Sequence, residues 1–113
     1  MSYYFIPEPQ REGTCYYEFY AGPWHRRKME FWREDSIVIS DLNFSFTGLE
    51  KLIAQVIPCF DAYGTTPVTK AQWEIITQKA TESGGELALA VSEAQPWVQN
   101  NFQKHDIFTI LGL

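Results

Sequence analysis

The residues best suited to chemistry or binding gather in one short stretch, WHRRKMEFW (residues 24–32). His25, Arg26, Arg27 and Lys28 lie side by side between two tryptophans, in a chain whose formal net charge is −5. Such a run could bind phosphate, contact a partner or ligand, or form the solvated end of a strand. Because strand side chains alternate between two faces, the run would form two pairs of cations rather than one patch of four. The solvated strand end is therefore favoured, partner contact comes second and phosphate binding last.

No catalytic motif is evident in the sequence. The two histidines, His25 and His105, belong to no pattern typical of nucleophilic or metal-assisted catalysis. The pair Gly84-Gly85 follows a predicted helix, where it is typical of a C-cap, whereas a phosphate-binding loop would follow a strand. We therefore predict that the protein is not an enzyme and uses neither a cofactor nor a metal ion. A weak hydrolase ranks third among the candidate functions.

Acidic side chains make up the predicted partner surface. Residues 36–113 hold eight Asp or Glu against four Lys or Arg, so the negative charge belongs to the later part of the chain. With the apolar side chains of the predicted helices turned inward, carboxylates remain outside, where they can steer and hold a basic protein. The competing interpretation is an ordinary solvated helix face. The predicted partner-binding residues are Asp61, Tyr63, Glu74, Glu82, Glu86 and Glu93.

Length and composition limit the classes of protein. The 113 residues predict a single domain, 1–113, and an aromatic content of 16% favours an aromatic core with some aromatic residues left for a surface site. The acidic balance argues against nucleic-acid binding. Neither a signal peptide nor a membrane span is evident, and Cys15 and Cys59 fit two reduced thiols. We therefore predict a cytoplasmic protein that binds neither nucleic acid nor membrane.

Strand patterns dominate the first part of the chain. CYYEFYA (15–21) and SIVIS (36–40) are rich in aromatic and β-branched residues, and HRRKMEFWRE (25–34) alternates as a strand does. The Gly-Pro pair at 22–23 predicts a turn before HRRKMEFWRE. Residues 7–14 are predicted to be a polar, loosely held lead-in, preceded by an apolar segment able to dock on the body.

The apolar residues of the later part of the chain are spaced as in helices. Apolar residues predict helices over 47–58, over 69–83 with Thr69 as N-cap, and over 85–105 with a kink or a break at Pro96.

The remaining segments complete the predicted fold. Residues 60–68 are predicted to form a loop, and the apolar segment DIFTILGL (106–113) to form a C-terminal strand within the sheet. The predicted class is α+β: an antiparallel sheet of three N-terminal strands plus the C-terminal strand, covered on one face by about three helices.

The last half of the chain resembles a family of small bacterial proteins. A Trp-containing helix follows a loop, a Gly-Gly-Glu break comes next, and a Pro-Trp segment with Asn-Phe leads to a terminal FTILGL strand. This succession is similar to immunity proteins of contact-dependent growth inhibition and related polymorphic toxin systems. The first half matches only as a set of aromatic strands. The residues that carry the resemblance are Trp73, Gly84, Gly85, Glu86, Pro96, Trp97, Asn101, Phe102 and the strand 107–113.

The resemblance implies a non-enzymatic protein that binds one cognate toxin domain and blocks its active site or its access to substrate. Toxin domains that attack nucleic acid, such as nucleases, tend to have basic clefts, which an acidic protein can occupy. The alternative function is a small-molecule-binding or regulatory domain, in which the aromatic residues of 15–32 line a pocket between sheet and helices.

Overall fold

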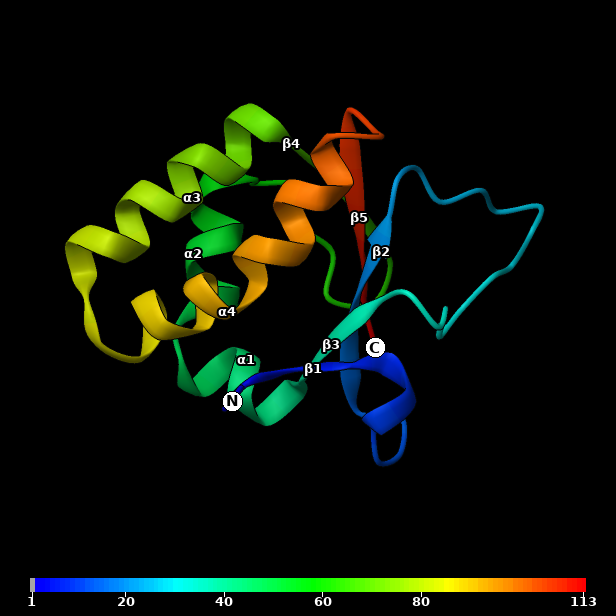
Figure 1. Ribbon diagram of the computed structural model, residues 1–113, viewed down its shortest axis with the longest axis horizontal. Helices are drawn as coiled ribbons and strands as arrows, with labels where there is room; N and C mark the ends of the chain where they lie inside the picture. Colours follow the sequence, from blue (N-terminus) through cyan, green and yellow to red (C-terminus); the bar gives the residue numbers. More distant parts are fainter. Residues whose placement is uncertain (1) are drawn as a thin grey trace.

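A five-stranded antiparallel sheet forms the centre of the molecule, with the helices packed against one of its faces (Figure 1). The structure is a computed structural model that describes residues 2–113. It confirms the predicted α+β class with helices on one face of an antiparallel sheet. The strands, in the spatial order β1-β3-β2-β5-β4, are β1 (Phe5–Pro7), β2 (Tyr16–Ala21), β3 (Ile37–Ser40), β4 (Thr65–Thr69) and β5 (Ile107–Leu111).

The helices largely follow the predicted pattern. Thr69 caps the helix that begins at Lys70, as predicted. Its hydroxyl accepts the amide of Gln72, and the Gln72 side chain accepts the amide of Thr69. Pro96 lies inside one continuous helix. No helix within residues 2–113 is both long and apolar enough to cross a membrane. The helices are a 3-10 turn η1 (Glu8–Gln10), α1 (Asp41–Phe46), α2 (Leu49–Val56), α3 (Lys70–Ser83) and α4 (Gly85–Phe102).

One predicted strand is wrong. Residues 25–34 lie in a loop, although their side chains alternate as strand residues do. The reason is that both edges of β2 and both edges of β3 are already paired, with β5 and β1 on their outer sides. A strand inserted between β2 and β3 would have to separate two partners that hydrogen-bond directly.

Two edge strands and a helix break were not predicted. β4 lies where a loop over 60–68 was expected, and its Pro67 is tolerated because β4 pairs only with β5. β1 arises from the N-terminal segment and pairs with β3. The predicted helix 47–58 begins later, as α2, because Gly48 has a left-handed φ of 85° and separates it from α1.

Aromatic side chains fill the space between the sheet and the helices, as the composition predicted. The Phe108 ring of β5 lies 4.9 Å from that of Phe19, and 5.7 Å from those of both Trp73 and Trp97. These distances are typical of stabilising aromatic pairs. Because β5 lies between β2 and β4, the end of the chain connects the strands of the first half to the edge strand of the second.

Phe108→Ala should lower the free energy of unfolding by about 3–5 kcal/mol, because it removes a fully buried ring from the centre of the core. Urea denaturation measures this change. Phe46→Ala is the matched control: this ring on α1 is 67% exposed, and its loss should cost no more than about 0.5 kcal/mol. Equal effects of the two substitutions would contradict the central position of β5.

Candidate functional site

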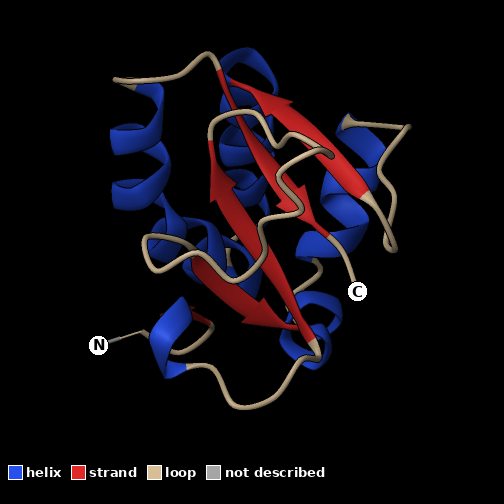
Figure 2. Cartoon of the chain, turned by 90° about the vertical axis from the view of Figure 1, so that its right-hand side faces the viewer, coloured by secondary structure: helices blue, strands red, loops and turns tan. Residues whose placement is uncertain are grey.

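Residues 22–36, between β2 and β3, cover the face of the sheet that the helices leave open (Figure 2). We call this segment the β2–β3 loop. Its fifteen residues include no helix or strand, and it projects away from the body of the molecule in Figure 1. Loops of this length without secondary structure are uncommon in compact domains and are usually functional when ordered. The segment is therefore the first candidate for the functional site.

A buried carboxylate holds the second half of the loop. Glu18 of β2 is 1% exposed and points away from the aromatic core. One carboxylate oxygen accepts the Trp32 amide at 2.7 Å; the other accepts the Arg33 amide at 2.9 Å and the Ser36 hydroxyl at 2.6 Å. Hydrogen bonds to an ionised acceptor are stronger than neutral ones. The signal in the sequence was Glu18 itself, a single carboxylate within an aromatic strand.

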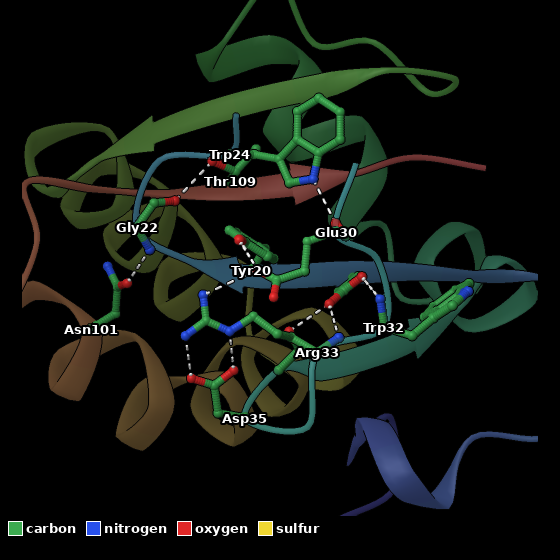
Figure 3. A network of polar contacts seen from close by, with 11 residues as sticks. Tyr20, Gly22, Trp24, Glu30, Trp32, Arg33, Asp35, Asn101 and Thr109 are labelled. Carbon is green, nitrogen blue, oxygen red and sulfur yellow. Dashed lines mark hydrogen bonds and ion pairs between the residues drawn. The ribbon is translucent and has the colours of Figure 1, made fainter. Parts of the chain in front are cut away.

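The loop is also anchored where it begins. The Gly22 amide donates to Oδ1 of Asn101 at 2.9 Å, and the Gly22 carbonyl accepts the Thr109 hydroxyl at 2.9 Å (Figure 3). Gly22 has a φ of 72°, and a β-carbon at this position would lie 2.8 Å from the His105 ring. Only glycine satisfies both conditions without a shift of neighbouring atoms.

A polar network fixes the middle of the loop against β2. The Tyr20 hydroxyl donates to the Glu30 carboxylate, and the Arg33 guanidinium lies 5.0 Å from the centre of the Tyr20 ring (Figure 3). Arg33 also pairs with Asp35 at 2.9 Å and with Glu30 at 3.7 Å. The Trp24 indole donates to the Glu30 carbonyl at 2.6 Å. Glu30 therefore contacts both Tyr20 of β2 and Trp24 near the start of the loop. Burial, followed by the hydrogen bond to Glu30, raises the pKa of the Tyr20 phenol.

The backbone of the loop is strained at two positions. Within residues 2–113, the non-glycine residues with positive φ are Met29 (48°) and Trp32 (57°). This conformation costs of order 1–3 kcal/mol per residue and is found where surrounding contacts impose it, often at functional sites. At Trp32 those contacts are the bond from its amide to Glu18 and the Arg11 guanidinium, 4.0 Å from the centre of its ring.

Side chains typical of binding surfaces remain in solvent on this fixed backbone. Met29 is 60% and Phe31 49% exposed, and the Trp24 ring packs beside Phe31 at 5.4 Å. The cations of residues 26–28 are exposed and take part in none of the three ion pairs formed by the described residues. Aromatic residues, Met and Arg are enriched in protein interfaces. The arrangement is thus suited to binding another molecule.

Two of the predicted partner-binding residues fasten the N-terminal segment to α4. The Glu93 carboxylate accepts the backbone amides of Tyr3, Tyr4 and Phe5 at 2.8, 2.8 and 3.0 Å. Glu86 accepts the Tyr4 hydroxyl, and this bond, with the two negative charges, raises the pKa of Tyr4 to about 12.

The other four predicted residues lie apart from this segment. Asp61 accepts the Tyr63 amide at 2.9 Å in the turn before β4, and Tyr63 is 80% exposed. Glu74 and Glu82 are exposed on α3. Glu82 and Glu86 line the same hollow, whereas Glu74 borders another. The structure therefore distributes the six residues over several parts of the surface.

The alternative function places the aromatic residues of 15–32 around a ligand pocket, but two aromatic residues of β2 belong to the core instead. Tyr17 and Phe19 are buried in the core. An open hollow of about 540 Å³ lies between α3 and α4, bordered by Trp73, Phe102 and several glutamines. This hollow is one candidate place for the small-molecule site of the alternative function. The described part of the chain has no group of three or more His, Cys, Asp or Glu able to hold a metal ion, and Cys15 and Cys59 are both free.

Glu18→Gln should lower the free energy of unfolding by about 2–4 kcal/mol. The two carboxylate oxygens now accept three donors, whereas glutamine has one oxygen and would turn its NH₂ group toward at least one of these donors. Denaturation measures the loss, and hydrogen exchange at the Trp32 and Arg33 amides should accelerate. Glu34→Gln, at an exposed position of the same loop, is the control and should change stability by less than about 0.5 kcal/mol. Unchanged exchange in the Glu18 variant would show that the carboxylate does not hold the loop.

Stability should fall at alkaline pH. Burial raises the pKa of Tyr17 and of Tyr20 in the folded protein, so above the ordinary tyrosine pKa of about 10 the unfolded chain loses these protons first. The contribution is complete below about pH 10 and declines as pH rises further. Denaturation at several pH values should show a shallower decline for Tyr20→Phe than for the wild type. Equal slopes for Tyr20→Phe and the wild type would refute the prediction.

Comparison of the chain with protein-family models, with curated proteins and with solved structures found no match in any of the three. The geometry of the β2–β3 loop is therefore the main basis for a functional proposal.

Proposed function

We propose that this protein binds one cognate toxin domain and neutralises it, in the manner of an immunity protein, and that the β2–β3 loop is its binding element. One observation carries the proposal: the loop backbone is held by the buried Glu18, while Met29 and Phe31 remain in solvent. A loop fixed before binding loses less conformational freedom on association. Exposed aromatic side chains and arginines are also the residues that most often anchor protein interfaces.

Residues that carry the resemblance to immunity proteins also hold the loop. Asn101 accepts the Gly22 amide, and the Trp97 indole donates to the Asp35 carbonyl at 2.7 Å. Thr109, within the terminal strand, donates to the Gly22 carbonyl. The resemblance therefore concerns the residues that position this loop as well as those that build the core. This connection supports the toxin-neutralising class over other kinds of binding protein.

A projecting loop suits inhibition by obstruction. The β2–β3 loop extends beyond the body of the molecule (Figure 1), so it can enter a cleft while the body remains outside. Bound in this way, the protein would block the active site of the toxin domain or the path of its substrate.

Co-expression with the neighbouring open reading frame, the expected source of the toxin domain, tests the proposed function. A stable complex should co-purify, and cells that produce this protein should survive the toxin. The control is the same toxin domain expressed with the Glu18→Gln variant, whose less tightly held loop should protect cells less at an equal level of soluble protein. If soluble wild-type protein neither associates with the toxin domain nor protects cells, the proposed function is wrong.

A further inference from the structure

Positive charge concentrates at the tip of the β2–β3 loop, whereas the rest of the molecule is strongly acidic. Residues 26–28 contribute three of the nine Lys and Arg, and the other six stand against fourteen Asp and Glu, a balance of −8. Arg33, also in the loop, is paired with Glu30 and Asp35. The three tip cations thus form a separate positive pole on an acidic body.

Apolar side chains lie beside this positive pole. The Lys28 amide donates to the His25 carbonyl at 3.0 Å, so the basic residues form a tight turn. On either side of this turn in the sequence are Trp24 and Phe31, whose rings pack together, and Met29 is also exposed. The tip therefore combines an exposed apolar cluster with three cations that belong to none of the ion pairs among residues 2–113.

We infer that this tip, residues 24–31, docks into a hollow of the partner protein that is apolar at its floor and acidic at its rim. The inference rests on the proposed function and specifies the chemistry of the toxin surface. Apolar side chains gain most when a complementary pocket removes them from water, and exposed cations are best matched by carboxylates around that pocket. The acidic helix residues Glu74 and Glu82 would instead require a basic partner surface, so the two possibilities differ in sign.

A protein surface fits the tip better than a membrane or a nucleic acid. Three cations are fewer than the clusters of about four to eight that hold segments on anionic membranes, and the acidic body would be repelled by lipid or nucleic-acid phosphates. The strained and tightly bonded backbone also points to a protein. A fixed arrangement of side chains matters for a shaped hollow and matters little for a fluid membrane interface.

Two charge reversals with opposite signs test the inference on the complex with the toxin domain. Arg26→Glu/Arg27→Glu should slow association roughly ten- to a hundredfold at low salt, and the effect should shrink as salt rises. The matched double reversal on α3, Glu74→Lys/Glu82→Lys, should not slow association. Binding kinetics at several salt concentrations measure both. If only the α3 variant slows association, the partner surface is basic and the inference fails, while neutralisation of the toxin domain itself stands.

Two alanine substitutions test the apolar floor. Phe31→Ala should weaken the complex about thirtyfold, mainly through faster dissociation, because it removes a side chain expected to be buried at the centre of the interface. Phe46→Ala removes an exposed ring on α1 and should leave the affinity unchanged. Equal affinities of the Phe31 variant and the wild type would overturn the inference.

Crosslinking in the native host separates this inference from the proposed function. A photoreactive phenylalanine analogue at position 31 should give one adduct, with the toxin domain, at a segment rich in Asp or Glu; the same analogue at position 63 should give none. Position 31 could instead crosslink to an acidic segment of a different protein. If Arg26→Glu/Arg27→Glu abolishes that adduct, the result refutes a toxin domain as the partner and supports the docking chemistry. Absence of an adduct from position 31 would overturn the inference. The inference would also be overturned if the wild type bound phosphatidylserine vesicles or a short single-stranded RNA and Arg26→Glu/Arg27→Glu abolished that binding.

Discussion

The Glu18 carboxylate has almost no access to water, and all of its hydrogen-bond donors among the described residues come from the β2–β3 loop. Two backbone amides and one hydroxyl satisfy its oxygens. Without the loop, this charge would face solvent from the middle of a sheet; without the charge, the amides of Trp32 and Arg33 and the Ser36 hydroxyl would lose their acceptor. The loop conformation and the position of the buried charge therefore depend on each other.

The two faces of the sheet consequently have different roles. Toward the helices, β2 and β5 present Phe19 and Phe108, which pack against Trp73 and Trp97 and supply the apolar burial that stabilises the domain. Toward the loop, the same strands present Glu18, Tyr20 and Thr109, each of which bonds to residues 22–36. Trp97 contributes to both: its ring contacts the core, and its indole N–H holds the Asp35 carbonyl. Trp97 of α4 therefore connects the packing of the core to the position of the loop.

Charge follows the same division. Two of the three loop carboxylates, those of Glu30 and Asp35, pair with Arg33, whereas the cations of residues 26–28 remain exposed at the tip. Outside the loop, Glu86 and Glu93 hold the N-terminal segment on α4. Some of the acidity that was predicted to attract a partner is therefore engaged within the molecule. A positive tip on an acidic body favours one orientation of approach to a charged partner.

Local patterns were sufficient for much of this fold. The aromatic and β-branched runs predicted β2 and β3, the apolar C-terminus predicted β5, and Thr69 with its downstream stripe predicted α3, because caps and side-chain periodicity act over a few residues. The WHRRKMEFW stretch was also singled out, but as a strand. Whether an alternating segment becomes a strand depends on a free sheet edge, and strand pairing joins residues that are distant in the sequence. The hydrogen bonds of Glu18 to Trp32 and Arg33 are likewise nonlocal, so the loop, its exposed tip and the candidate site emerged only once the sheet was assembled.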